Sequence, residues 1–363
     1  MTVRYSNSSI ANYIGCPLKY FLGDDQGLAP LAPQSAHDAR FGTAWHAAMQ
    51  TYYTALDASA SFDEAVVDAQ AAFADAYPES AYPAILPARS QGKTFVNGIA
   101  AIAAYADRWR EEDSHFTILY VEQLEAAADT PDIDRVLRLD LVYRDDRDDM
   151  IYGRDFKTTG GYIDNYYWGR YEPNSQIRQY AAHLTEKYAA QGEGIGGFVI
   201  DATGFKHRSK AVTPRKGPNK GVYQPAGDWH DFGRMTFNPN ANALELEAGN
   251  VAYWIGRIEA DRAAGVWGYN TNHCRAYGEL CQYYWACKNG YAWPGDEELL
   301  LTQFRQVCRE VIDGDLRCQL DRGHDGPHDS TPPPPPDAAA DYEMVVDEAV
   351  EASDDDANGW ITE

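Results

Sequence analysis

The chain has 363 residues and 44% hydrophobic content, enough to bury a substantial core. Its net charge of −24 is unfavourable for binding a polyanion, but eleven acidic residues and no lysine or arginine lie within residues 329–363. No apolar run is long enough to cross a membrane, and the polar start shows no signal peptide. These features exclude a membrane protein, and we expect a cytoplasmic one.

Hydrophobic periodicity predicts the order of the secondary structure elements. Helices are expected near residues 8–21, 40–57, 62–77, 90–112, 174–190 and 241–263. Strands are expected near residues 116–126, 134–144, 149–158, 197–201 and 230–237. This order predicts an α/β fold with a mixed sheet, flanking helices and an N-terminal helical insertion, and no internal repeat is visible.

Acidic and basic side chains are expected to meet on two of these strands. Residues two apart on a strand point to the same face, so Asp155 and Lys157 project together while Phe156 points toward a core. On the preceding strand, Arg138 and Asp140 share one face and Leu137, Leu139 and Leu141 share the other. Carboxylate oxygens hold Mg²⁺, and a lysine beside them can orient or deprotonate a metal-bound water. The pattern is that of metal-assisted phosphodiester hydrolysis, although a solvated strand edge would also explain it.

Four of the six cysteines form a second group. In a reducing compartment, clustered cysteines more often bind metal than form disulfides. Cys274, Cys281 and Cys287 are close in sequence, and three thiolates need a fourth ligand for an iron–sulfur cluster, for which Cys16 is available. Two alternatives remain: a zinc site completed by His273, and Cys16 as a buried apolar thiol.

The order of these motifs resembles a known family. The chain carries Cys-Pro-x-Lys-Tyr from Cys16, a helical His46, Asp140, Asp155-x-Lys157, Gln176-x-x-x-Tyr180 and then the three late cysteines. Over about residues 5–290 it is similar to the iron–sulfur branch of the RecB-like PD-(D/E)xK nucleases, which includes AddB-type nuclease domains, CRISPR-adaptation exonucleases and many phage exonucleases. The wide Cys-x6-Cys-x5-Cys spacing resembles the phage members better than AddB.

The resemblance implies a role for each matching residue. His46, Asp140 and Asp155 would hold Mg²⁺ or Mn²⁺, and Lys157, Gln176 and Tyr180 would complete the catalytic set. Cys16, Cys274, Cys281 and Cys287 would bind a [4Fe–4S] cluster in a segment that closes a restriction-endonuclease-like core. Without the resemblance, His46 reads as a half-buried helix histidine, Gln176 as a surface residue and Tyr180 as a core aromatic.

The C-terminal part divides into two further units. Cys308, Cys318, His324 and His328 have the composition of a tetrahedral zinc site, with a flexible tail carrying incidental histidines as the alternative. The acidic segment after Pro332–Pro336 has the composition of a disordered tail. We therefore expect a nuclease domain over 1–300, a zinc-binding module over 301–330 and a disordered tail over 331–363.

One basic segment interrupts the acidic chain. Its cations are expected in a mobile loop or hairpin arm that contacts phosphates, or else in a solvated loop. They are Lys206, Arg208, Lys210, Arg215, Lys216 and Lys220. The resulting hypothesis is a metal-dependent DNA exonuclease of phage-type recombination or end processing, in the host cytoplasm if phage-encoded, with a recombinase or single-strand-binding protein as partner. A non-hydrolytic iron–sulfur scaffold of a recombination or CRISPR-adaptation complex is the alternative.

Overall fold

A computed structural model describes residues 3–31, 37–78, 90–130, 133–213, 222–223, 225–276, 279–291, 295–306, 311–313 and 316–317. The principal helices are α1 (Asn7–Gly15), α2 (Pro17–Tyr20), α3 (His37–Asp57), α4 (Phe62–Ala76), α5 (Phe95–Asp113), α6 (Asn165–Trp168), α7 (Ser175–Ala189), α8 (Ala241–Ala264), α9 (Tyr284–Asn289) and α10 (Glu297–Leu300). The strands are β1 (Val3–Ser6), β2 (Leu28–Pro30), β3 (Phe116–Thr130), β4 (Ile133–Asp145), β5 (Met150–Thr159), β6 (Gly194–Arg208), β7 (Gly227–Phe237), β8 (Arg275–Ala276), β9 (Glu279–Leu280), β10 (Phe304–Gln306), β11 (Val311–Asp313) and β12 (Leu316–Arg317).

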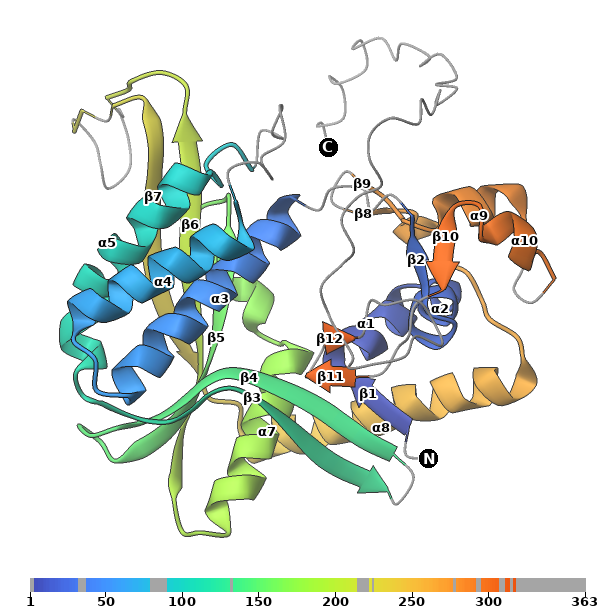
Figure 1. Cartoon of the computed structure of the whole chain (residues 1–363). Helices are drawn as coiled ribbons and strands as arrows, with labels where there is room; N and C mark the ends of the chain where they lie inside the picture. The colour runs from blue at the N-terminus through green and yellow to red at the C-terminus, as the bar shows by residue number, and fades with distance from the viewer. Residues whose placement is uncertain are drawn as a thin grey trace, which may run out of the picture.

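A six-stranded mixed sheet forms the centre of the molecule (Figure 1). Its strands follow the order β1-β4-β5-β6-β7, and β3 also pairs with β4. The β1–β4 and β5–β6 pairs are parallel, whereas β3–β4, β4–β5 and β6–β7 are antiparallel. The mixed α/β architecture predicted from the sequence is therefore confirmed.

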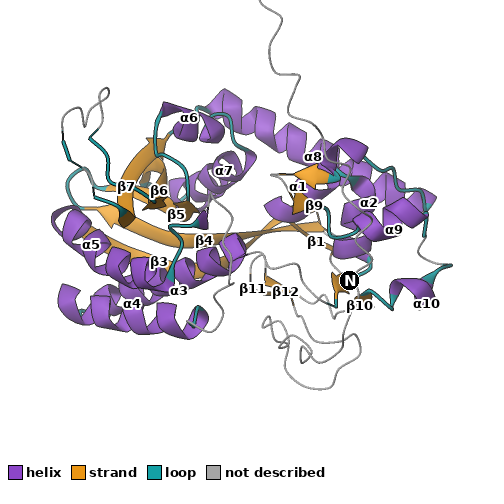
Figure 2. Cartoon of the chain, turned by 90° about the horizontal axis from the view of Figure 1, so that it is seen from above, coloured by secondary structure: helices purple, strands orange, loops and turns teal. Residues whose placement is uncertain are grey.

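Helices cover both faces of this sheet, as the view from above shows (Figure 2). One face packs against α3, α4 and α5 through an aromatic core in which Trp45, Tyr105 and Phe205 are fully buried. The other face packs against α7 through Tyr180, Leu184 and neighbouring strand residues. Because strand side chains alternate between the faces, neighbouring residues of β5 enter different cores.

The N-terminal segment is held by residues from the far end of the chain. Tyr13 and Tyr20 pack with α8, and the Phe21 ring stacks on Trp267 with centroids 4.9 Å apart. Strand β2 pairs with β10, so that Pro30 lies opposite Phe304. The first 30 residues thus have no core of their own and complete one made by residues after 250.

The predicted helices and strands are present, although the structure also has short elements that were not predicted, namely α6, α9, α10, β2 and β8 to β12. The helix expected over 8–21 is interrupted at Cys16, which is extended because Pro17 disfavours helical geometry in the residue before it. Strand β1 was not predicted. Strand β6 continues to Arg208, so the start of the basic segment belongs to the sheet and not to a loop. The proposed zinc ligands and residues 331–363 lie outside the described residues, among which no helix is long and apolar enough to cross a membrane.

Candidate active site

The candidate site lies where two paired strands separate. The β4–β5 ladder ends at Leu141 opposite Arg154, after which β4 continues against β3 and β5 continues against β6. Asp140 and Asp155 are the next residues on the two strands. The backbone N–H of Phe156 donates to Asp140 Oδ2 over 2.8 Å, which holds the separated strands in register. The sheet itself therefore places two carboxylates at one opening.

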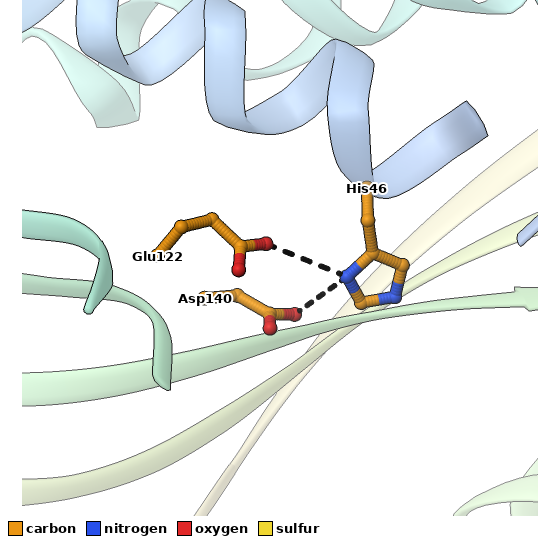
Figure 3. A group of neighbouring side chains, drawn as sticks. All are labelled: His46, Glu122 and Asp140. Atoms are coloured by element: carbon orange, nitrogen blue, oxygen red, sulfur yellow. Dashed lines mark ion pairs between the residues drawn. The ribbon is translucent and has the colours of Figure 1, made fainter. Parts of the chain in front are cut away.

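Helix α3 brings His46 to this opening. Its Nδ1 lies 3.1 Å from Asp140 Oδ2 and 3.8 Å from Glu122 Oε1, and Figure 3 shows both carboxylates turned toward the same ring nitrogen. One ligand atom from each of His46, Glu122 and Asp140 lies within 4.8 Å of the others. Two carboxylates and an imidazole in this arrangement could hold a divalent metal ion.

Glu122 is the residue that the sequence analysis missed. The pairs Val121–Leu141 and Gln123–Leu139 place it opposite Asp140 in the β3–β4 ladder. Its φ of 50° lies in the left-handed region, which a non-glycine residue rarely adopts and which is often found at functional sites. Arg138 Nε lies 2.5 Å from the second Glu122 oxygen, Oε2. A signal for Glu122 existed in the sequence, because it is an acid within the predicted strand before the one that carries Asp140.

The irregular backbone at Glu122 coincides with a change of face on β4. Leu137 and Leu139 pack into the core beneath α7, whereas Leu141 packs into the core beneath α3. The prediction that these three leucines share one face is therefore wrong for Leu141. Strict alternation does not pass through Asp140, because Glu122 opposite it has a left-handed backbone and β5 departs beside it.

Strand β5 and helix α7 supply the second half of the cluster. Lys157 Nζ lies 2.6 Å from Asp155 Oδ2, and Phe156 points away and is buried in the α3 core, as predicted. Gln176 Nε2 donates to Asp155 Oδ1 over 3.4 Å and to the Tyr180 hydroxyl over 3.2 Å. Gln176 and Tyr180 are four residues apart on one helix face. Tyr180 is also a core residue and only 3% exposed. It therefore matches the core aromatic that the sequence suggests, and it also contacts Gln176 as the resemblance implies.

The electrostatics of the cluster favour binding a cation. Burial opposes protonation of His46, but the Asp140 charge and hydrogen bond outweigh it and raise the pKa of His46 to about 10. Burial raises the pKa of Asp155 to about 6; Lys157 opposes the rise and Asp140 adds to it. Although burial opposes ionisation of Asp140, His46 lowers the pKa of that carboxyl. A bound metal ion would compete with a proton for the His46 ring nitrogen.

The side chains of the cluster differ in their exposure to solvent. The side chains of His46 and Lys157 are 32% and 29% exposed, whereas those of Glu122, Asp140 and Asp155 are 2%, 7% and 5% exposed. The carboxylates therefore lie at the bottom of the site, and a ligand would meet the histidine and the lysine first.

The four predicted cluster cysteines are neighbours in the fold. Cys16 ends α1, and its Sγ accepts from the Asn270 backbone over 3.4 Å. Burial raises the pKa of the Cys287 thiol to about 11, and Cys281, Cys16 and Cys274 add to that rise by their proximity. All four thiols are free of disulfides. The ring of His273 lies beside Gly15, so the alternative ligand is also close to Cys16.

The predicted basic arm is only partly present on the surface. Lys206 lies in β6 and pairs with β7, which agrees with the hairpin alternative and not with a loop. It is 6% exposed and lies 2.5 Å from Asp231 Oδ2, so the expectation that it freely contacts phosphates is corrected. Arg208 donates to the Pro225 carbonyl and Lys210 is exposed. Arg215, Lys216 and Lys220 lie outside the described residues.

A mixed sheet that opens over a histidine, carboxylates and a lysine is an arrangement suited to metal-dependent hydrolysis. Comparison with protein families identifies the class of hydrolase. Residues 4–288 match the model of the PD-(D/E)XK nuclease superfamily. The chain belongs to this superfamily, whose members use divalent metal ions. No curated protein matches the chain.

Proposed function

We propose that this protein is a Mg²⁺- or Mn²⁺-dependent DNA exonuclease that acts at DNA ends in phage-type recombination or end processing. The observation that supports it most directly is the meeting of His46, Glu122 and Asp140 with the Asp155–Lys157 pair at the point where β4 and β5 separate. The family supports hydrolysis by a metal-dependent nuclease, and the specific exonuclease role is the further proposal.

Each side chain has a role that follows from its position. His46, Asp140 and Asp155 would hold the divalent ion, with Glu122 as a further carboxylate of the same group. A bound ion supplies an activated water and stabilises charge on the phosphate. Lys157 lies at the exposed edge, where its ammonium group can orient the attacking water and contact the phosphate. Gln176 orients the Asp155 carboxylate through Oδ1.

The direct test is degradation of DNA labelled at the 5′ or 3′ end, single-stranded and double-stranded, with and without Mn²⁺. Metal-dependent loss from one end is expected for wild type, and Lys157→Ala should be nearly inactive with an unchanged fold. Cleavage by Lys157→Ala at the wild-type rate would show that the site is assigned wrongly. DNA binding by wild type without metal-dependent cleavage would favour the non-hydrolytic scaffold.

We also propose that Cys16, Cys274, Cys281 and Cys287 bind a [4Fe–4S] cluster that joins the N-terminal helices to the segment after α8. The support is the proximity of four free thiols from distant parts of the chain. Protein purified without oxygen should be brown, with broad absorbance near about 400 nm from thiolate-to-iron charge transfer. Cys16→Ser should lose the colour and lower the melting temperature. Colourless protein that contains zinc at these cysteines and no iron would favour the His273 alternative.

The remaining expectations concern residues outside the described part of the chain. Zinc binding by Cys308, Cys318, His324 and His328 predicts one zinc ion per chain that is lost in a variant lacking both histidines. A recombinase or single-strand-binding partner and a cytoplasmic location also remain predictions.

A further inference from the structure

We propose that Tyr162 and Trp229 form a stacking platform for the unpaired bases of single-stranded DNA that enters the candidate active site. The inference rests on the proposed nuclease function and names its substrate as a single strand. Three observations lead to it: a lysine held between two aromatic rings, the exposure of one of those rings, and the position of the group relative to Lys157.

The platform is built around a buried cation. Lys206 Nζ lies 4.5 Å from the ring centroid of Tyr162 and 4.4 Å from that of Trp229. The same ammonium group is neutralised by Asp231 Oδ2 at 2.5 Å. Cation–π attraction to both rings favours this orientation before any ligand binds. The structure thus brings two aromatic side chains together around one ammonium group.

The outer ring is open to solvent. Tyr162 is 69% exposed, although Lys206 beneath it is 6% exposed. Tyr166, in α6 close by in sequence, is 84% exposed. Trp229 is half-buried, and the Arg208 guanidinium carbon lies 5.4 Å from its ring centroid. Exposed aromatic faces beside cations are the features with which proteins bind single strands without reading sequence.

Strand register places this group on the face that carries Asp155 and Lys157. Lys157 pairs with Ala202 of β6, and Lys206 lies four residues further along the same strand. Because alternate residues share a face, Ala202, Gly204 and Lys206 point the same way, and the spacing along β6 is about 13 Å at about 3.3 Å per residue. That distance corresponds to no more than about four nucleotides at the duplex rise of about 3.4 Å.

Gly204 lies on β6 between Ala202, which pairs with Lys157, and Lys206. It leaves room for the ion pair of Lys206 with Asp231. A Cβ there would lie 2.0 Å from Asp231 Oδ1 and 3.4 Å from Lys206 Nζ. A side chain at this position would force the Asp231 carboxylate to shift. Gly204 therefore allows the carboxylate to stay beside Lys206.

The chemistry of the platform selects a single strand over a duplex. Paired bases hide their faces in the helix, whereas unpaired bases can lie on a tyrosine or tryptophan ring. A duplex also brings two charged strands toward a chain of net charge −24. Near the platform, Asp231 is neutralised by Lys206, which reduces the repulsion of one phosphate strand.

The test measures binding separately from hydrolysis. Full-length protein without added divalent metal is titrated into a fluorescently labelled oligothymidylate, into an abasic strand of equal length and into a duplex, and anisotropy is recorded. Tyr162→Ala should weaken oligothymidylate binding about tenfold and leave abasic-strand binding unchanged, because stacking on one ring stabilises a bound base by about that factor. Tyr162→Phe should retain the affinity.

The matched control is Tyr253→Ala, which removes a tyrosine that is 59% exposed on α8 and should change nothing. Equal losses on the thymidylate and abasic strands would overturn the stacking proposal, as would unchanged binding by Tyr162→Ala. Wild-type protein that binds oligothymidylate through Tyr162 yet never cleaves DNA would refute the nuclease function alone. Wild-type protein that cleaves DNA while Tyr162→Ala binds normally would refute the platform alone.

Discussion

Two buried charged clusters lie on opposite faces of β5, and they differ in what they can do. Arg154 and Asp155 are adjacent in sequence, so their side chains enter different cores. Arg154 belongs to a closed cluster beneath α3 and α5, whereas Asp155 belongs to the candidate active site. Both residues are almost fully buried, so burial of charge alone does not distinguish a functional site from a structural one.

The closed cluster is built from ion pairs between two arginines and two aspartates, and Glu112 at its edge also pairs with Arg234 at 2.9 Å. Arg234 Nη1 lies 2.7 Å from Asp113, and its Nε lies 2.7 Å from Asp201. Arg154 lies 3.7 Å from Asp113 and 3.5 Å from Asp201. The hydroxyl of Tyr105 donates to Asp201. Two arginines therefore offset two aspartates in a place that solvent does not reach.

The candidate active site lacks this closure. It gathers three carboxylates, from Glu122, Asp140 and Asp155, and the two side chains at its mouth, His46 and Lys157, are about one-third exposed. Removing a residue from the closed cluster should therefore affect folding, and removing one from the open cluster should affect activity. The comparison teaches that access to solvent, more than burial of charge, marks a site for a cation.

The largest effect is expected from Asp155→Asn. The substitution keeps the shape of the side chain but removes a charge that would hold the metal ion and pair with Lys157. DNA hydrolysis should fall by about 10²–10⁴-fold, the range for loss of a group that acts on the reacting atoms. The melting temperature should stay within a few degrees of wild type. Loss of folding together with activity would show that the open cluster is structural as well.

Arg154→Met should destabilise the fold strongly. It leaves Asp113 and Asp201 with one arginine in a solvent-free core, and removing one partner of a buried ionic group costs about 3–5 kcal/mol in the free energy of unfolding. Denaturant unfolding measures the change. Arg257→Met, which removes an exposed pair with Asp261, is the control and should have little effect. An effect of Arg154→Met no larger than that of the control would contradict the account of the closed cluster.

Glu122→Gln should weaken metal binding more than it weakens the fold. The amide keeps the volume, but one carboxylate of the His46 group is lost and Arg138 loses its charged partner. The Mn²⁺ concentration for half-maximal cleavage should rise about tenfold, at the lower end of the range for residues around a metal. Titration calorimetry with Mn²⁺ alone gives the same comparison without DNA. An unchanged Mn²⁺ affinity would exclude Glu122 from the ion-holding group.

The smallest effect is expected at Gln176. Gln176→Ala removes a long hydrogen bond of 3.4 Å to Asp155 Oδ1, so the carboxylate loses orientation but keeps its charge. We expect hydrolysis to fall by less than about tenfold, consistent with about 1 kcal/mol for one hydrogen bond. Tyr180→Phe, which removes the hydroxyl that accepts from Gln176, should have a still smaller effect on rate. A larger loss of hydrolysis in Tyr180→Phe than in Gln176→Ala would contradict the view that Gln176, and not Tyr180, orients Asp155.

Sequence reasoning found the residues whose spacing is set by a single element. Asp155 and Lys157 follow strand alternation, and Gln176 and Tyr180 follow helix periodicity. It missed Glu122 and the change of face on β4, because both depend on how β3 pairs with β4 and on where β5 departs from it. It misplaced Lys206 because its neutralising partner, Asp231, lies on another strand. Local pattern predicts local geometry, whereas pairing between strands decides which charges are free to act.

The pairing of β2 with β10 has a consequence for how the protein is made. Leu28–Pro30 leaves the ribosome early, but its partner Phe304–Gln306 follows after most of the chain has been synthesised. At about 5–20 residues per second, the wait is on the order of ten to fifty seconds. During that time Phe21, Leu22 and Leu28 have no core to enter. A ribosome stalled before residue 304 would therefore present an apolar N-terminal segment to chaperones, and a nascent chain at this stage should be sensitive to protease at its beginning while its central sheet is already protected.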